Sequence, residues 1–466
     1  MRKLVLISLA VGVVMAAAGC KLVVTPSAPQ GWFFLNEGAN GSGQYVNGPG
    51  NPPAGRGSAL LTIDGTGRES IATTTYSGDQ LAGFSQLKYS TYQAFSGSPN
   101  ETLTMQFDVD YDSTDSSTAY QGRLVYVPAD AGAVTPGQWQ SWDTMSGAAA
   151  WYSSGSGSSS FRPIVGGAAQ ANPPCTQATP CTWATLMSDY PNARINPSVS
   201  GTPGLFLIRA GGPITNGFVG ATDNVIIGIG SNEIDNNFEP GDGNTVVNSS
   251  NAASLGFGFV QETPTGSGAF VTGPNGSDGA GSAQLTVDAT GGEALANDLY
   301  AGTRLDHINF LSYKTYQQAV GTNATTLQFD ADYDATDSST AFQGRAVFEP
   351  SLSGQAAITD QTWQTWNPLT APSGWWQTGN AIVGGNPAGK ACTQAAPCSF
   401  AKLIATYPNA SIRPITGQSA GQPIAGGIWL KAGGGWSPGF TGNVDSLTIA
   451  VNVGGVNGTS TYDFEP

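Results

Sequence analysis

The chain has 466 residues, enough for two or three domains, and its 64 glycines, 29 prolines and 11% charged residues suit an all-β protein with many turns. Aromatic residues make up 10% of the chain, so there is enough apolar material for folded cores. The net charge of −15 argues against nucleic-acid binding, because phosphate recognition needs basic patches. A single histidine, His307, nearly excludes His-based catalysis and metal sites built on several histidines.

The first twenty residues, MRKLVLISLAVGVVMAAAGC, have the pattern of a signal peptide: a positive start, an apolar run and small residues before Cys20. The run is too short for a stable transmembrane span. Its ending, AAGC, resembles the bacterial lipobox, in which the cysteine becomes the lipid-modified N-terminus, although Leu usually stands where Ala17 does. Ordinary signal-peptide cleavage is the alternative. We expect an exported lipoprotein, anchored at the cell surface or the periplasmic face by a lipid on Cys20, with residues 21–30 as a tether.

The chain contains a duplication. Residues 107–123 (FDVDYDSTDSSTAYQGR) recur as residues 329–345 (FDADYDATDSSTAFQGR). The only differences are Val109 to Ala331, Ser113 to Ala335 and Tyr120 to Phe342. The sequence around these stretches aligns as well, which predicts one repeat at residues 31–240 and another at 256–466. Residues 241–255 (GDGNTVVNSSNAASL) form a polar stretch that we expect to be a flexible linker.

The repeated stretch predicts a β-hairpin. Apolar and acidic residues alternate before the polar run 113–118, the period of a half-buried strand with its aromatic face inward and its carboxylates outward. The polar run predicts a loop, and the segment after it, which contains Arg123, predicts the returning strand.

Three interpretations of this acidic hairpin stay open. The carboxylates would be ligands for calcium, a hard cation that prefers oxygen, although an EF-hand loop needs Gly where Ser113 stands. Asp112 and Arg123, with Arg345 in the second repeat, would instead hydrogen-bond a sugar. The third interpretation is an exposed acidic stripe paired with the cross-strand arginine, worth little energy. The candidate calcium ligands are Asp108, Asp110, Asp112 and Asp115, with Asp330, Asp332, Asp334 and Asp337 in the second repeat.

An aromatic pair lies in a Gly/Ser-rich or Gly/Pro-rich surrounding of each repeat: Trp151 and Tyr152, then Trp375 and Trp376. An exposed aromatic side chain in a loop can stack on a sugar ring, whereas a buried one fills the core. We treat the four residues as candidate ligand contacts.

The five cysteines predict two disulfides, because Cys175 and Cys181 match Cys392 and Cys398 and leave Cys20 unpaired, as expected for a lipid-modified residue. Each closes a short loop and should contribute about 2–3 kcal/mol. Apolar residues at helical spacing follow each pair, which predicts one short amphipathic helix per repeat.

The cysteine pair, the helix and the closing Phe-Glu-Pro (residues 238–240 and 464–466) resemble a module that recurs in exported bacterial surface proteins and has no established activity. More loosely, the opening GWFF and the closing strands are similar to jelly-roll carbohydrate-binding modules. In those modules acidic residues near the first and last strands often hold a structural calcium. That resemblance implies four further candidates for metal binding: Glu37, Asp223, Glu262 and Asp445.

The sequence therefore predicts an all-β protein with two tandem antiparallel β-sandwiches of jelly-roll type, each with one short helix. The function expected is non-catalytic binding at the cell surface, most readily of polysaccharide or cell-wall glycan, with avidity from two copies. One alternative is a structural or adhesive surface lipoprotein with no small ligand. The other is an enzyme like a glycoside hydrolase, which would use two carboxylates.

Overall fold

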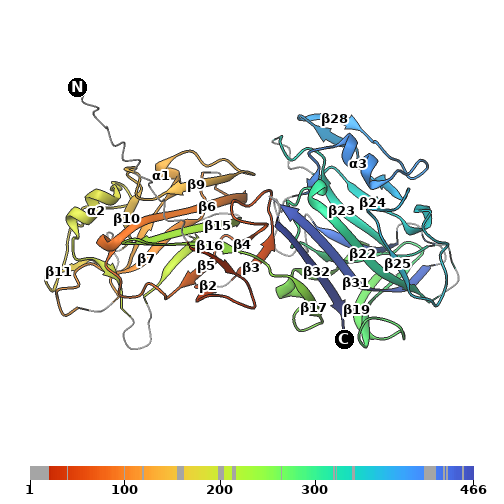
Figure 1. Cartoon of the computed structure of the whole chain (residues 1–466), viewed down its shortest axis with the longest axis horizontal. Helices are drawn as coiled ribbons and strands as arrows, with labels where there is room; N and C mark the ends of the chain where they lie inside the picture. Colours follow the sequence, from red (N-terminus) through yellow and green to blue (C-terminus); the bar gives the residue numbers. More distant parts are fainter. Residues whose placement is uncertain are drawn as a thin grey trace, which may run out of the picture.

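The structure is a computed structural model of the chain (Figure 1). The predicted signal peptide lies outside the described residues, apart from Cys20. The described residues are 20–38, 40–98, 100–117, 120–154, 162–197, 204–211, 217–263, 265–318, 321, 323–337, 342–413, 427–433, 436, 439–453 and 456–466.

Strands of residues 20–238 form one β-sandwich, called unit 1, and strands of residues 243–464 form a second, called unit 2 (Figure 1). The first sheet of unit 1 contains β1 (Cys20–Val24), β3 (Gly41–Asn47), β4 (Gly57–Ile63), β6 (Phe84–Ser96), β9 (Trp139–Asp143), β15 (Phe218–Ile229) and β16 (Asn232–Phe238). Its second sheet contains β2 (Trp32–Asn36), β5 (Arg68–Thr73), β7 (Thr104–Asp110), β8 (Arg123–Tyr126), β10 (Trp151–Ser153), β13 (Arg194–Ile195) and β14 (Phe206–Gly211).

Unit 2 repeats this arrangement strand by strand. The first sheet contains β17 (Gly243–Val247), β19 (Gly266–Thr272), β20 (Gly281–Asp288), β22 (Ile308–Gln317), β25 (Gln364–Trp366), β31 (Gly439–Val453) and β32 (Val456–Phe464). The second contains β18 (Phe257–Gln261), β21 (Gly292–Asn297), β23 (Thr326–Asp332), β24 (Arg345–Phe348), β26 (Trp375–Gln377), β29 (Ser411–Ile412) and β30 (Ile428–Gly433).

The strand order is that of a jelly roll. In unit 1 the central strands run β4-β15-β6-β9 in one sheet and β5-β14-β7-β8 in the other, so the chain crosses between the sheets from β4 to β5, β5 to β6, β6 to β7, β8 to β9 and β14 to β15, while β7 and β8 form a hairpin within one sheet. In unit 2 the corresponding orders are β20-β31-β22-β25 and β21-β30-β23-β24. Nearly all neighbours are antiparallel, and the parallel pairs are β1 with β16 and β17 with β32. The predicted fold class, tandem antiparallel β-sandwiches, is confirmed.

Short helices and hairpins decorate each sandwich. The α-helices are α1 (Pro128–Ala131), α2 (Trp183–Asp189) and α3 (Phe400–Thr406), and the 3-10 turns are η1 (Leu81–Gly83), η2 (Ala253–Leu255), η3 (Leu305–His307) and η4 (Pro350–Leu352). Two small hairpins, β11–β12 (Ile164–Val165, Ala168–Ala169) and β27–β28 (Ala381–Val383, Asn386–Gly389), occupy matching places. The predicted helices after the cysteine pairs are α2 and α3, while α1 in unit 1 is an additional four-residue helix.

The predicted tether and linker were wrong in part. Residues 21–30 include most of β1, and residues 241–255 include β17, and each of these strands pairs with the last strand of its own unit. Val24 and Val247 have no exposed surface, because each apolar strand end packs into a core. Each sandwich therefore begins earlier in the sequence than predicted, and only residues 239–242 connect the paired strands of the two units.

The two units also contact each other directly. Backbone N–H groups of Asn47 and Gly50 donate hydrogen bonds to the carbonyls of Leu299 (3.1 Å) and Gly302 (3.0 Å). Arg56 of unit 1, which is buried, donates to Asp242 in the connection at 2.7 Å. The expectation of freely moving units on a flexible linker is therefore replaced by two packed sandwiches, side by side in Figure 1.

The core explains two of the aromatic candidates. Trp151 and Trp375 have no exposed surface and lie against Phe107 and Phe329, with ring centroids 5.6 and 5.4 Å apart. The sugar-stacking prediction was wrong for these two tryptophans, because they occupy inward-pointing positions of β10 and β26 and lie between the sheets.

The carboxylates of the repeated stretch are not the exposed stripe that the alternation predicts. Asp108, Asp110 and Asp112 are all buried, and Asp110 has no exposed surface. The alternation correctly separates two faces of β7, but loops and arginine side chains cover the acidic face as well. Asp108 pairs with Arg123 across β7 and β8, as the third interpretation predicts, yet this pair is buried.

Replacing Trp375 by Ala should lower the free energy of unfolding by about 3–5 kcal/mol, because it leaves a large cavity between the sheets. Urea unfolding followed by fluorescence measures this loss. Trp376→Ala, on the neighbouring residue, is the control and should cost much less. Equal stability of Trp375→Ala and the unsubstituted protein would contradict the core assignment.

Candidate functional site

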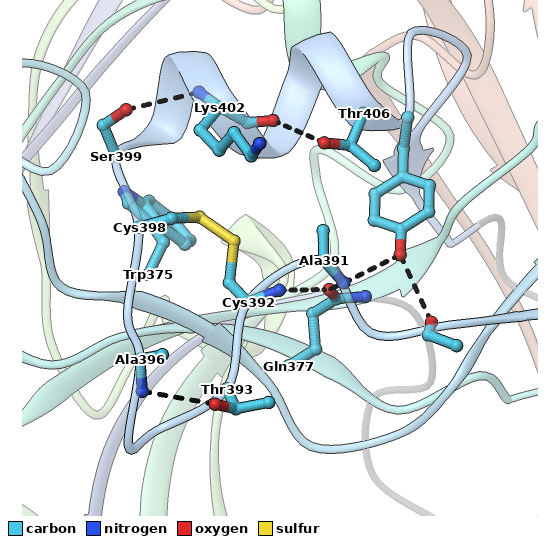
Figure 2. Close-up of a disulfide and its surroundings, with 12 residues drawn as sticks. Trp375, Gln377, Ala391, Cys392, Thr393, Ala396, Cys398, Ser399, Lys402 and Thr406 are labelled. Atoms are coloured by element: carbon cyan, nitrogen blue, oxygen red, sulfur yellow. Dashed lines mark hydrogen bonds between the residues drawn. A yellow bond between two sulfur atoms is a disulfide. The ribbon is translucent and has the colours of Figure 1, made fainter.

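The disulfide segment fixes the edge strand of the second sheet. Cys392 and Cys398 are bonded, with Cα atoms 5.7 Å apart, and Cys175–Cys181 matches at 5.4 Å, so both predicted disulfides are present. The backbones of Trp375 and Cys398 exchange hydrogen bonds of 3.0 and 2.9 Å, and Gln377 N–H donates to the carbonyl of Cys392 at 3.1 Å. Figure 2 shows the disulfide beside Trp375 and Gln377. The strand β26 is thereby held between β24 and the disulfide segment.

The helix after the disulfide is capped as predicted. The Ser399 hydroxyl accepts the Lys402 N–H at 3.3 Å (Figure 2), and Thr182 accepts the Thr185 N–H at 3.1 Å in unit 1. Gln377 further secures the segment, because its side-chain oxygen accepts the N–H groups of Ala391 and Cys392 at 2.6 and 3.2 Å. These contacts hold the backbone on both sides of residue 376.

Strand alternation sends Trp375 inward and Trp376 outward. The side of the second sheet that faces away from the first sheet is called the outer face here. Trp376 lies half-buried on the outer face of unit 2, and Tyr152 lies half-buried at the matching position of unit 1. The structure thus separates the four aromatic candidates into two core residues and two outer-face residues.

An arginine organises the outer face in each unit. In unit 1 the Arg123 guanidinium donates from Nε to Asp108 Oδ1 at 2.7 Å and from both Nη atoms to Glu37 at 2.6 and 2.8 Å. Arg209 adds a contact to Glu37 at 3.0 Å. We call these four residues the unit 1 ion-pair frame.

Unit 2 has the same frame. Arg345 contacts Asp330 at 2.7 Å and Glu262 at 2.6 Å, and Lys431, in place of Arg209, also contacts Glu262. The guanidinium lies 4.0 Å from the ring centroid of Trp429, a cation–π distance. Of the predicted metal ligands, Glu37, Glu262, Asp108 and Asp330 therefore contact basic side chains.

These contacts shift the pKa values of the groups. Burial alone would raise the pKa of the Glu37 and Glu262 carboxyls, but the adjacent cationic side chains outweigh burial and lower both pKa values. Burial alone would lower the pKa of the Arg123 guanidinium, but its carboxylate partners raise it. The charged forms of Glu37, Glu262 and Arg123 are therefore favoured, whereas burial raises the pKa of the Asp108 carboxyl and lowers that of the Arg209 guanidinium.

A pocket of about 400 Å³ lies on the outer face of unit 2, within the usual volume range of ligand pockets. Aromatic side chains, the frame and other polar groups share its walls. It is lined by Glu262, Thr326, Gln328, Phe342, Arg345, Val347, Glu349, Trp376, Thr378, Gln394, Lys431, Gly433 and Trp436.

Glu349 fixes the aromatic wall of this pocket. Its Oε2 accepts the indole N–H of Trp376 and a side-chain N–H of Gln394, each at 3.0 Å. The ring of Trp376 is therefore oriented by a hydrogen bond at its edge.

Sequence reasoning missed several pocket residues. Phe342 is 57% exposed at the pocket, and Tyr120 is 37% exposed at the matching position. The signal was available, because this position keeps an aromatic residue within the duplicated stretch. Lys431, Glu349 and Trp436 carried no motif in the sequence, since strands far apart in the chain bring them together.

Two predicted metal ligands in each unit instead fasten a hairpin. Asp334 and Asp337 accept the N–H groups of Gly384 and Gly385, at 3.0 and 2.8 Å, in the turn between β27 and β28. Asp112 and Asp115 accept those of Gly166 and Gly167 at 3.0 and 2.9 Å in unit 1. These contacts explain why the acidic loop and the Gly-Gly turn occur together in both units.

The other predicted metal ligands also have partners in the protein. Asp110 contacts Arg194 at 2.8 Å, and Asp332 accepts a side-chain N–H of Gln343 at 3.1 Å. Asp223 accepts the N–H groups of Ala54 and Phe238 at 2.8 and 3.0 Å. Asp445 accepts three backbone N–H groups in the same way, from residues 278, 446 and 464.

Within the described ranges, the one Cys/Asp/Glu/His group tight enough for a metal is Cys175, Cys181 and Asp189, and its sulfurs form the disulfide. The calcium sites stay a prediction.

No protein-family model matches the chain, and no curated protein matches it in sequence. Among solved structures, the N-terminal CBM22-1–CBM22-2 tandem domain of Paenibacillus barcinonensis Xyn10C is 9% identical, covers 91% of this chain and 94% of its own, and has a TM-score of 0.24. A structure described as the basis for the promiscuous specificity of carbohydrate-binding modules of the β-sandwich superfamily is 10% identical, covers 89% of this chain and 99% of its own, and has a TM-score of 0.23. At these scores the likenesses carry no argument, and the fold rests on the strand order above.

Replacing Asp334 by Ala should release the β27–β28 hairpin, because the Gly384 N–H loses its acceptor; the expected stability loss is about 1 kcal/mol. Hydrogen exchange should be faster at Gly384 and its neighbours in the hairpin. The matched hairpin of unit 1, held by Asp112, is the internal control. Unchanged exchange at Gly384 would contradict this role.

A second prediction concerns pH. Glu293 is 2% exposed, and burial raises its pKa to about 7, with the Glu262 carboxylate adding to the effect. Between about pH 4.5 and 7 the folded protein therefore holds a proton that the unfolded chain releases, so this residue makes stability fall as pH rises.

Glu293→Gln should reduce this loss of stability with rising pH. The variant should be about as stable as the unsubstituted protein at pH 5 and more stable than it at pH 8. Urea unfolding from pH 5 to 8 measures this effect. Glu69→Gln, at the matching position of unit 1, should act in the same direction, because burial raises the pKa of Glu69 to about 7 as well. An unchanged pH dependence in Glu293→Gln would contradict the prediction.

Proposed function

We propose that the protein is a non-catalytic cell-surface protein that binds carbohydrate on the outer face of its β-sandwich units. The observation that carries the proposal is the unit 2 pocket, in which Trp376, Trp436 and Phe342 stand beside the ion-pair frame. The pocket combines these aromatic side chains with several convergent polar side chains, which suits a ligand that has both apolar and hydrogen-bonding surface. A sugar ring offers an apolar C–H face to aromatic side chains and hydroxyl groups to Arg345, Lys431 and Gln328.

The state of the pocket carboxylates supports binding rather than hydrolysis. A glycosidase needs one carboxylic acid with a raised pKa to protonate the leaving group. Glu262 has a lowered pKa, because Arg345 and Lys431 hold it as a carboxylate. Glu349 already accepts hydrogen bonds from Trp376 and Gln394.

Export and anchoring are part of the proposal. Cys20 is exposed at the start of β1, so a lipid on it would hold unit 1 close to the membrane. Two disulfides suit an oxidising compartment outside the cytoplasm. Across the residues whose structure is described, no helix has the length and apolar character needed to cross a membrane.

The contacts between units favour one second candidate, a structural or adhesive surface protein. The hydrogen bonds of Asn47 and Gly50 to unit 2 make the pair of sandwiches suitable as a spacer. This alternative predicts no glycan binding at the pocket.

The test is retention of the chain from residue 20, carrying Cys20→Ser, on insoluble polysaccharides and cell-wall preparations. We expect retention on at least one polymer. The double variant Tyr152→Ala/Trp376→Ala should lose it by roughly tenfold or more, because central aromatic contacts dominate binding. Phe310→Ala is the matched control, since Phe310 is 46% exposed on β22 of the other sheet. Folded protein that no polymer retains would overturn the proposal and favour the structural candidate.

A further inference from the structure

The two outer faces share a frame but differ in their aromatic wall. The central arginine, its two carboxylate partners and the neighbouring Thr and Gln residues match in both units. The differing positions, unit 1 first, include Tyr120 and Phe342, Val127 and Glu349, Tyr152 and Trp376, Leu207 and Trp429, and Arg209 and Lys431. The outer face of unit 1 can therefore be compared directly with that of unit 2, residue by residue.

The main difference lies at Glu349. In unit 2 this carboxylate holds the indole N–H of Trp376 at 3.0 Å and also binds Gln394. In unit 1 the matching residue is Val127, whose side chain has no hydrogen-bond acceptor, and the aromatic residue is the smaller Tyr152. A ring that is already fixed loses less conformational freedom when a ligand stacks on it, so unit 2 is better organised for binding.

Unit 2 also adds an aromatic contact to its frame. The guanidinium of Arg345 lies over the ring of Trp429, 4.0 Å from its centroid, whereas Leu207 at the matching position of unit 1 offers no ring. Trp429 is itself buried among Val260, Ala294 and Ala296. The buried ring of Trp429 therefore supports Arg345, one of the polar residues that line the unit 2 pocket.

The charges of the pocket indicate an uncharged ligand. Its basic side chains, Arg345 and Lys431, both contact Glu262, and the lining also includes Glu349. Asp330, which contacts Arg345 from β23, adds a further carboxylate. The pocket thus has no excess positive charge to attract a uronate or sulfate group, and the chain as a whole carries −15.

We propose that unit 2 provides the principal binding site, that its ligand is an uncharged glycan, and that Glu349 is a positioning residue that acts through Trp376. This inference rests on the proposed function and adds the binding unit, the ligand class and the residue that separates the two units.

The test is affinity electrophoresis of the whole chain from residue 20, with Cys20→Ser, in gels containing soluble polymers. The uncharged probes are arabinoxylan, mixed-linkage glucan and mannan, and the anionic probes are polygalacturonate and alginate. At least one uncharged polymer should retard the protein, and the anionic polymers should not. Trp376→Ala alone should weaken the retardation about tenfold or more.

The role of Glu349 has its own variants. Glu349→Val, which copies unit 1, should weaken binding several-fold, whereas Glu349→Gln keeps an oxygen acceptor for the indole N–H and should bind nearly as the unsubstituted protein does. Grafting Val127→Glu and Tyr152→Trp onto Trp376→Ala should restore binding in unit 1. Melting temperatures of all variants show whether each one folds.

The outcomes separate this inference from the proposed function. If the folded protein binds no polymer, both fail. The double variant Tyr152→Ala/Trp376→Ala is compared with Trp376→Ala alone. If the double variant loses binding while Trp376→Ala retains at least half of it, carbohydrate binding stands and unit 2 is not the principal site. Retardation by anionic polymers alone would overturn the ligand class, and full binding by Glu349→Val would overturn the positioning role.

Discussion

An arginine between two carboxylates is the interaction on which the outer face of each unit depends. Arg123 and Arg345 connect a central strand of the second sheet to the residue that follows the sheet's edge strand, through Asp108 and Glu37 or Asp330 and Glu262. Removing one partner would leave a largely buried charge uncompensated, at a cost of roughly 3–5 kcal/mol. This cost explains how the duplicated stretch can end in Arg in both copies while residues around it differ.

The fixed frame leaves the surrounding positions free to diverge. Each unit keeps the disulfide that orders the edge strand, the hairpin held by two aspartates and the inward tryptophan. Against this constant background, unit 2 has Glu349 and Trp376 where unit 1 has Val127 and Tyr152. The units are also packed together, so any difference between their faces is presented in one fixed arrangement rather than on a flexible linker.

Period-two alternation, the cysteine spacing and the helical spacing after each cysteine pair were enough to predict the sandwiches, both disulfides and helices α2 and α3. Alternation could not tell which face of β7 is covered, so Asp110 was expected in solvent although arginine and loop residues bury it. β1 directly follows the predicted signal peptide, and β17 is a short apolar run in polar surroundings, so neither segment was recognised as a strand. The pocket itself depends on strands far apart in sequence, so only Arg345, Glu262 and Trp376 were found in advance.

The most direct measurement is an NMR spectrum of the indole N–H groups, with ¹⁵N-labelled tryptophan, as a bound oligosaccharide is added. The chain has 11 tryptophans, so individual signals can be assigned by substitution. Binding at the outer face of unit 2 predicts shifts of the Trp376 and Trp436 signals, with the signals of buried Trp151 and Trp375 unmoved. Binding that leaves the Trp376 signal in place, or shifts only tryptophans away from this pocket, would contradict the account.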